Sequence, residues 1–242
     1  MKYNFDEVID RSHTDSVNVE GFRPYMFSDN PDVKFSTPDD KFIRMWVADM
    51  DFAVAPEILQ AIKDRVERRI LGYTGIYGDE YYDAFSVWCK ERYDWSFPKE
   101  QLVFSPGIIP ALYELVGDLV KENEKYLIVT PAYGFFRHAG NYNRREVLCS
   151  PLKYEEGNFS IDFEDFEEKA ADPAVKLVLW CNPHNPTGRV WTLEEAKKIA
   201  EIVEKYDLWI ISDEIHCDLL RGGIKHVPMG KIMPEYDKLI TC

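Results

Sequence analysis

The sharpest pattern of apolar and polar positions in the chain lies between residues 177 and 216. Two short apolar runs, 177–180 and 208–211, have the length and the bulky residues of buried strands. Between them, apolar residues recur at helical spacing, namely Leu193, Ala196, Ile199, Ala200 and Val203. The pattern therefore predicts a strand, a helix and a second strand in succession.

Polar residues follow both predicted strands. Thr192 and Glu195 match a capping box, which starts a helix by satisfying its first backbone N–H groups. A helical crossover of this length joins parallel strands, and ligands of parallel sheets bind beyond the carboxyl ends of the strands. We therefore expect the polar turn at 181–188 and the carboxylate of Asp213 to meet at one site.

Several segments carry a resemblance to one enzyme family. The segment 182–188 reads Asn-Pro-His-Asn-Pro-Thr-Gly, and the segment 212–216 reads Ser-Asp-Glu-Ile-His. Together with 45–52, 107–112 and 189–192, they resemble the fold-type I enzymes that use pyridoxal 5′-phosphate (PLP). Within that group the chain is most similar to the cystathionine β-lyase or cysteine-S-conjugate β-lyase branch of the class I/II aminotransferase-like family.

The resemblance extends from about residue 40 to the end of the chain and implies an α/β fold. The fold would be the large domain of a PLP-dependent transferase, a mostly parallel sheet with flanking helices. We expect residues 1–45 to form an N-terminal arm and the start of a small domain. Residues 46–242 would form the large PLP-binding domain, incomplete at its C-terminal end.

Weaker patterns predict the remaining elements. Residues 1–40, rich in Asp, Asn, Ser and Pro, read as an arm or a set of turns. Pro56 is expected to open a helix to about residue 69 whose apolar face is Ile58, Leu59, Ile62 and Val66. A helix at about 81–93 is expected to bury Phe85, Trp88 and Cys89. Strands are expected at 102–104, 126–129, 148–154 and 238–242, a helix near Pro110, and a solvated helix at 162–168.

A phosphate site is predicted where a helix begins after residue 107. Pro110 suits a first helical turn and Gly107 allows close backbone approach, so free N–H groups and the positive helix end can receive a phosphate. The resemblance places the PLP phosphate on the backbone amides of Gly107, Ile108 and Ile109. It also sends Tyr73 across a dimer interface to the neighbouring subunit's cofactor phosphate, with a packed loop tyrosine as the alternative.

The resemblance assigns further residues to the cofactor ring. Tyr133 would stack on the pyridine ring, and Asn185 would donate its amide to the phenolic oxygen. Asp213 would pair with the pyridine nitrogen and keep it protonated, which makes PLP an electron sink for a substrate carbanion. His216 stands where many relatives carry a tyrosine that contacts the phenolic oxygen. A structural tyrosine and a hydrogen-bonded structural histidine are the alternatives for Tyr133 and His216.

By the same resemblance, Ala48 and Asp49 would lie on the substrate side of the site. The alternative for acidic residues before the helix at 56 is compensation of the helix dipole. The family's Schiff-base lysine belongs to a Ser-Lys pair that follows the strand at 238–242, so it is expected beyond Cys242. No catalytic residue is therefore assigned within the chain, because the lysines in its last part match no such motif: Lys225, Lys231 and Lys238.

Composition limits the classes of binding partner and the cellular location that we expect for this protein. A formal net charge of −14 opposes nonspecific binding to nucleic acid or to an anionic membrane. No apolar run reaches the ~20 residues of a membrane-spanning helix, and the N-terminus lacks the regions of a signal peptide, so we expect a cytoplasmic protein. The cysteines lack CxxC spacing, so we expect mostly buried thiols, with neither disulfides nor a metal site: Cys89, Cys149, Cys181, Cys217 and Cys242.

The resemblance implies that the protein, in its complete form, is a PLP-dependent carbon–sulfur β-lyase. It would act as a homodimer on an amino-acid substrate, cystathionine or another S-substituted cysteine, and release thiol, pyruvate and ammonia. A PLP-dependent aminotransferase is the first alternative, because both reactions need Tyr133, Asn185 and Asp213. A noncatalytic or regulatory protein on the same fold is the second, because the sequence lacks the motif lysine.

Overall fold

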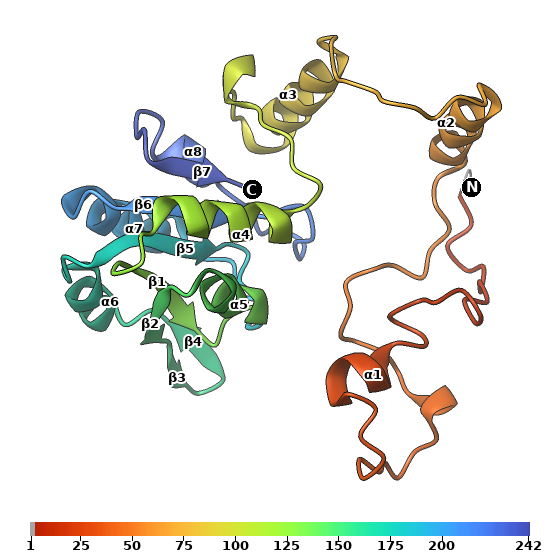
Figure 1. Ribbon diagram of the computed structural model, residues 1–242, viewed down its shortest axis with the longest axis horizontal. Coiled ribbons are helices and arrows are strands. Elements are labelled where there is room, and N and C mark those ends of the chain that lie inside the picture. The colour runs from red at the N-terminus through yellow and green to blue at the C-terminus, as the bar shows by residue number, and fades with distance from the viewer. Residues whose placement is uncertain (1–2) are drawn as a thin grey trace. The chain divides into compact units, whose positions relative to one another are not determined.

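A computed structural model describes residues 3–242 of the chain. The chain divides into two compact units, Met1–Ile76 and Tyr77–Cys242. The second unit contains the sheet and its helices (Figure 1). The predicted division at residue 45 into an arm and a large domain stays a prediction.

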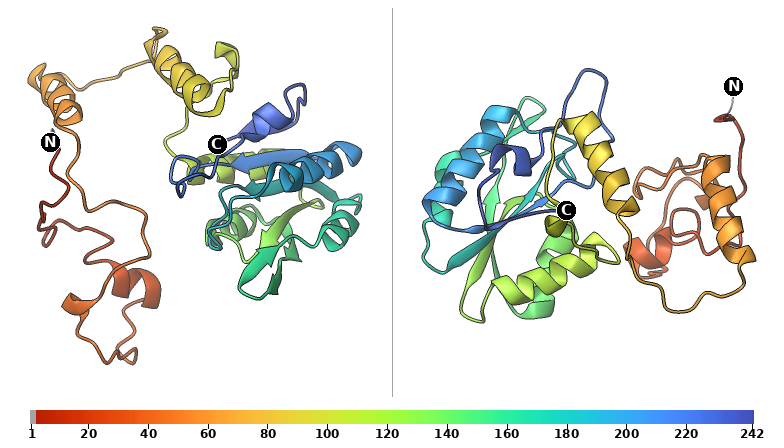
Figure 2. Two further views of the ribbon diagram at one scale, coloured as in Figure 1. Left: turned by 180° about the vertical axis from the view of Figure 1, so that it is seen from behind. Right: turned by 90° about the horizontal axis from the view of Figure 1, so that it is seen from above.

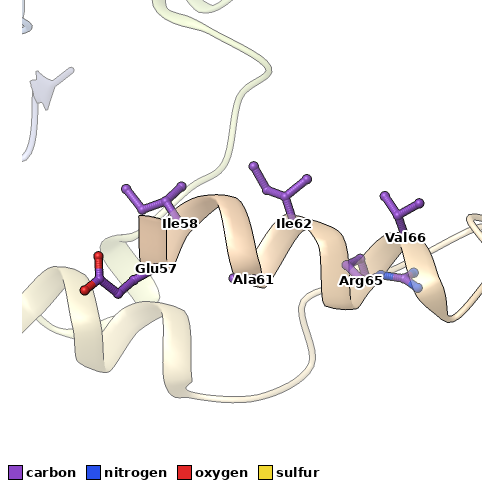
Figure 3. Close-up of a pocket in the computed structure, with 6 residues that line it drawn as sticks. All are labelled: Glu57, Ile58, Ala61, Ile62, Arg65 and Val66. Carbon is purple, nitrogen blue, oxygen red and sulfur yellow. The ribbon is translucent and has the colours of Figure 1, made fainter. Parts of the chain in front are cut away.

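The first unit contains two α-helices and a short 3-10 turn: α1 at Phe22–Phe27, η1 at Asp39–Lys41 and α2 at Pro56–Glu67. The helix predicted from Pro56 is confirmed, with the proline in its first turn. Figure 3 shows Ile58, Ile62 and Val66 pointing to the same side of α2. Their exposed fractions are 56%, 55% and 55%, so this apolar face is exposed within the first unit.

The second unit is built on a five-stranded parallel sheet with the order β2-β1-β5-β6-β7. Its strands are β1 Lys125–Thr130, β2 Glu146–Pro151, β5 Val175–Cys181, β6 Trp209–Asp213 and β7 Leu239–Thr241. A separate antiparallel hairpin consists of β3 Lys153–Glu155 and β4 Asn158–Ser160. The helical elements are α3 Glu80–Tyr93, η2 Lys99–Gln101, α4 Ile108–Leu119, α5 Gly134–Asn143, α6 Phe163–Ala170, α7 Leu193–Lys205 and α8 Met229–Ile232.

The strand order creates a topological switch point between β1 and β5. From β1 the chain crosses by α5 to β2 on one side, and from β5 it crosses by α7 to β6 on the other. In sheets of this kind ligands bind in the crevice where the strand order reverses, beyond the carboxyl ends of the strands. The edge at which β1, β5 and β6 end, called here the carboxyl edge, is therefore where a site is expected.

Helices cover both faces of the sheet, and alternate strand residues divide between two buried cores (Figures 1 and 2). The α4–α5 core contains Leu112, Val116, Val120, Tyr126, Ile128, Phe136, Ala139, Leu177, Leu179, Cys181 and Ile211. The α6–α7 core includes Leu127, Val129, Phe166, Val178, Trp180, Ile199, Val203, Ile210 and Met229. Because Asp213 follows Ile211 by two residues in β6, its side chain points to the α4–α5 face.

The α4–α5 core contains one close approach that depends on a glycine. The hydroxyl of Tyr126 donates a hydrogen bond of 2.6 Å to the carbonyl oxygen of Phe136. A Cβ atom at Gly140 would lie 2.3 Å from that hydroxyl oxygen. Position 140 therefore has no room for a side chain while Tyr126 keeps this place.

The capping box predicted for α7 is confirmed. The side chain of Thr192 accepts a hydrogen bond from the N–H of Glu195 at 3.1 Å, and Glu195 accepts one from the N–H of Thr192 at 2.8 Å. The predicted apolar face is buried at Ala196, Ile199, Ala200 and Val203, whereas Leu193 is 39% exposed. The strand, helix and strand predicted from 177 to 213 are therefore present as β5, α7 and β6.

Several other sequence predictions are wrong in detail. Residues 102–104 form no strand, because no described strand pairs with them, and Val103 is 85% exposed. The strand predicted at 148–154 divides into β2 and β3. The helix at 163–170 is not simply solvated, since it buries Phe166 and Ala170. In α3 only Cys89 is buried, while Phe85 and Trp88 are 40% and 42% exposed.

The prediction that most thiols are buried is also wrong. Of the five free cysteines only Cys89 and Cys181 are buried.

Candidate functional site

Asp213 lies at the carboxyl end of β6, where that strand pairs with β5. The register places Asp213 opposite Cys181, and the carbonyl oxygen of Asp213 accepts a hydrogen bond of 3.0 Å from the N–H of Asn182. Asp213 is only 4% exposed. The last residue of β6 and the turn that follows β5 are thus joined by their backbones, as the sequence predicts.

The Asp213 carboxylate is buried with few stabilising contacts. Its Oδ1 atom accepts a hydrogen bond of 3.2 Å from the N–H of Ile215, and no lysine or arginine pairs with it among residues 3–242. Burial raises the pKa of Asp213, against the lowering effect of the Ile215 N–H and of His216. A buried carboxylate of this kind is stabilised by a cationic hydrogen-bond donor, which a protonated ring nitrogen would supply.

The turn after β5 is a hydrogen-bonded frame around Asn185. The N–H of His184 donates to the carbonyl of Arg189 at 2.7 Å, and the N–H of Gly188 donates to the carbonyl of His184 at 2.8 Å. Gly188 has φ +72°, a left-handed conformation that glycine adopts without strain. This frame leaves Asn185 half-buried at the carboxyl edge, in the turn that follows β5.

His184 belongs to this frame. It is 2% exposed, its Nδ1 lies 2.8 Å from the Thr187 hydroxyl, and its ring packs against Trp191 at 5.3 Å between centroids. Burial and then the nearby charge of Arg189 lower the pKa of His184 to about 4. His184 is therefore neutral at physiological pH and supports the turn.

The N-terminus of α4 reaches the same edge. Residues 120–124 lead directly from α4 into β1, so the helix runs against the strand and begins beside the strand's carboxyl end. The first N–H groups of a helix have no partner within it, so those of Ile108 and Ile109 are available to an anion. A Cβ atom at Gly107 would meet only Pro110 Cδ, at 3.6 Å, so the approach to this turn is open.

Tyr133 follows β1 and precedes the first residue of α5. It is half-buried and packs against the α4–α5 core, as do Ile108 and Ile109. Its ring lies 5.2 Å from that of Phe135 and 6.2 Å from that of Phe136, measured between centroids. An aromatic plane is thus present on the face of the sheet toward which Asp213 points.

The structure brings together most of the residues predicted for the cofactor. Gly107 precedes α4, and Ile108 and Ile109 begin it. Tyr133 follows β1 and Asn185 follows β5. Asp213 ends β6 and His216 follows it, so all these residues lie at the carboxyl edge. Half-buried His216 lies in the turn after Asp213, and its charge lowers the pKa of that carboxyl group. These placements concern position, and the roles of the residues stay proposals.

The remaining predicted residues belong to the first unit. Tyr73 and Ala48 are exposed. The Asp49 carboxylate pairs with Arg11 and accepts a hydrogen bond of 2.8 Å from Asn18, and these contacts lower its pKa. The acidic residue in the first turn of α2 is Glu57, and Asp49 precedes that turn.

Sequence reasoning missed a buried polar group on the opposite face of β6. Glu214 is 5% exposed and its carboxylate accepts hydrogen bonds from Ser212, His226 and the N–H of Met229. The signal available in the sequence was the pair Asp213-Glu214, because neighbouring residues of a strand point to opposite faces. His226 lies in an irregular segment and carried no pattern.

Two thiols adjoin Asp213. Cys181 is its partner in β5, and Cys242 follows the last residue of β7. Burial, with a smaller contribution from the charge of Asp213, raises the pKa of Cys181 to about 12 and that of Cys242 to about 11. Both groups are therefore neutral thiols at physiological pH, so they add no charge to the site.

The donor set fits PLP. The buried Asp213 carboxylate would bind a ring nitrogen. The open turn at Gly107, with the N–H groups of Ile108 and Ile109, would bind a phosphate. The ring of Tyr133 would stack on a pyridine ring. The half-buried amide of Asn185 adds a donor for a phenolate oxygen.

Comparison with known proteins identifies the family. A family model for aminotransferase class I and II matches residues 40–242, so the chain belongs to this family. Its relatives place it in the C–S lyase and cystathionine β-lyase branch. The predicted family and the predicted α/β fold are confirmed, since the parallel sheet with flanking helices matches the N-terminal half of fold-type I PLP enzymes.

Three relatives illustrate the similarity. Cystathionine beta-lyase PatB of Bacillus subtilis is 38% identical over 199 residues, which are 82% of this chain and 51% of PatB. The PLP-bound C-S lyase from Staphylococcus hominis has a TM-score of 0.90 and 47% identity, over 100% of this chain and 58% of that one. Cystalysin from Treponema denticola has a TM-score of 0.88 and 34% identity, over 100% of this chain and 59% of cystalysin. The chain thus spans about half the length of the curated relatives it matches.

Proposed function

We propose that the protein, in its complete form, is a PLP-dependent C–S β-lyase that acts on cystathionine or another S-substituted cysteine. The observation that carries the proposal is the buried carboxylate of Asp213 at the carboxyl edge, with a single backbone donor and no lysine or arginine paired with it among the described residues. Membership in the C–S lyase and cystathionine β-lyase branch supports the reaction class.

When bound, PLP supplies an electron sink for negative charge that develops at the substrate Cα. In the proposal, Asp213 accepts a hydrogen bond from the ring nitrogen and favours its protonated form, because an adjacent carboxylate stabilises the cation. The hydrogen bond from the Asn182 N–H to the Asp213 carbonyl oxygen fixes the backbone of Asp213 at the end of β6. A fixed backbone suits a carboxylate that must keep one orientation toward the ring nitrogen.

The other site residues bind and orient. The N–H groups of Gly107, Ile108 and Ile109 hold the phosphate at the positive end of α4, and Tyr133 covers one face of the ring. Asn185 donates to the phenolic oxygen, and His216 contacts the same oxygen. The half-buried state of Tyr133 and Asn185 supports these roles, since each keeps part of its surface for a ligand.

We further propose a homodimer in which Tyr73 binds the phosphate held by the neighbouring subunit, with Ala48 and Asp49 on the substrate side. The exposed apolar face of α2, formed by Ile58, Ile62 and Val66, supports an association of subunits. No helix among the described residues is long and apolar enough to cross a membrane. The cytoplasmic location stays a prediction.

A pyruvate assay on the complete protein tests the reaction. With L-cystathionine, pyruvate and free thiol should form in equal amounts without any 2-oxo acid, because elimination at Cβ returns the cofactor to its starting form. Strict dependence on an added 2-oxo acid would assign the protein to the aminotransferases. Absence of both reactions with bound PLP would favour a noncatalytic protein.

A further inference from the structure

Glu214 and His226 form a buried pair that the proposed cofactor contacts do not use. Their side chains are 6% and 0% exposed, and Glu214 Oε2 lies 2.6 Å from His226 Nε2. The second ring nitrogen of His226, Nδ1, is buried without a hydrogen-bond partner among the described residues. Among the described residues, the His226 ring therefore forms its hydrogen bond with Glu214 alone.

The Glu214 carboxylate joins three parts of the second unit. Its Oε1 atom accepts hydrogen bonds of 2.8 Å from the Ser212 hydroxyl in β6 and of 2.8 Å from the N–H of Met229 at the start of α8. Its Oε2 atom reaches His226, whose ring packs edge-on against Tyr93 of α3 at 5.6 Å between centroids. One side chain thus fixes the end of β6 to α8 and, through His226, to α3.

The turn fixed in this way is the one that holds Asp213. The Asp213 carboxylate accepts its hydrogen bond from Ile215, the residue after Glu214, and the turn closes with a hydrogen bond of 2.8 Å from the N–H of Cys217 to the carbonyl of Glu214. Asp213 and Glu214 are neighbours on opposite faces of the sheet. A shift of the Glu214 anchor would therefore rotate the donor that directs the Asp213 carboxylate.

We propose that Glu214 is a positioning residue for the cofactor site: with His226 it anchors the turn 214–217 in the core and so directs the Asp213 carboxylate toward the cofactor ring nitrogen. The proposal rests on the proposed function. A buried carboxylate contributes little to stability compared with an apolar group of the same volume, so its place directly after Asp213 is better explained by control of geometry.

A double-mutant cycle on the complete protein tests this role. The probe is 4′-deoxypyridoxine 5′-phosphate, which keeps the ring nitrogen and phosphate but has no aldehyde, so its binding needs no lysine. Glu214→Gln should raise its Kd about tenfold when Asp213 is present, and less than about twofold in an Asp213→Asn background, since coupled neighbours are not additive. Glu201→Gln, which removes a charge from the exposed face of α7, is the matched control and should leave the Kd unchanged.

A purely structural role would give the same factor in both backgrounds, and that result overturns the proposal. If Glu214→Gln does not fold, the histidine serves instead: His226→Gln keeps an N–H donor for Glu214 and should bind the probe normally, whereas His226→Leu should bind it weakly. Equal affinities for these two variants also overturn the proposal. If the wild type binds no probe at all, the proposed function fails, and this inference fails with it.

Discussion

At the residue scale, burial decides which groups at the carboxyl edge carry charge. Burial lowers the pKa of His184 to about 4 and raises those of Cys181 and Cys242 to about 12 and about 11, so these groups are neutral at physiological pH. Burial also raises the pKa of Asp213, and a bound cation would oppose that shift. The site is thus arranged so that a cationic ring would meet a single acidic partner.

Replacement of Asp213 tests that partner. Asp213→Ala should fold but lose most β-elimination activity, roughly a hundredfold or more, a loss of the size seen when one preorganised polar contact is removed from an active site. Pyruvate release and a circular dichroism spectrum of the same preparation measure the two effects. Asp237→Ala, on an exposed residue, should keep full activity. Near-normal turnover of Asp213→Ala would refute the assignment.

The neutral state of His184 predicts a pH dependence of stability. The unfolded chain binds a proton at this residue near pH 6.5, but the folded chain does so only near pH 4. The unfolded state therefore gains the proton first as the pH falls, and stability should decrease from about pH 6.5 to about pH 4, by on the order of 3 kcal/mol at most.

Denaturant unfolding at several pH values measures this effect. In His184→Gln the decrease over the same pH window should be smaller, because the titrating group is gone. His138→Gln, at an exposed position, should retain the wild-type pH dependence. An unchanged slope in His184→Gln would contradict the assignment.

At the scale of the element, local patterns were sufficient for β5, α7 and β6. The capping box and the helical spacing are properties of neighbouring residues, and the structure confirms both. Strand pairing depends on residues that are distant in sequence, and this explains why the strand predicted at 102–104 is wrong. The segment has the apolar residues typical of a strand, but none of the described strands pairs with it. The anchor of Glu214 was missed for a related reason, since His226 joins it through an irregular segment.

The capping box of α7 gives a prediction about stability. Thr192→Ala should lower the free energy of unfolding by about 1 kcal/mol, because the side chain no longer accepts the hydrogen bond from the N–H of Glu195. Urea unfolding of the whole chain measures the change. Thr37→Ala, at an exposed threonine of the first unit, should change it little. Equal effects of the two substitutions would argue against a capping contribution.

At the scale of the whole molecule, the parallel sheet collects residues that are distant in sequence. Asp213 ends a strand, Gly107 and Tyr133 directly precede helices, and Asn185 lies in the turn that follows β5. The topology alone therefore brings these four residues to one edge. The sequence predicted this meeting through the rule for parallel strands. It could not test the proposed role of Tyr73, because in the proposal that residue binds a phosphate held by a second chain.

The exposed face of α2 gives a prediction about assembly. If this face is a dimer contact, Ile58→Glu with Ile62→Glu should shift the complete protein toward monomers, because two charges would replace exposed apolar side chains. Sedimentation velocity measures the shift. Lys63→Glu, which also introduces an acidic residue on α2, should leave the dimer intact. An active monomer in the wild type would contradict the dimer proposal.

The contact between Tyr126 and Gly140 has a consequence for sequence variation in the family. Because a Cβ atom at position 140 would collide with the tyrosine hydroxyl, position 140 cannot gain a side chain while Tyr126 keeps its place. A relative with alanine at the position of Gly140 is expected to carry a shorter side chain at the position of Tyr126. The two columns of a family alignment should therefore covary, although neither residue touches the proposed cofactor.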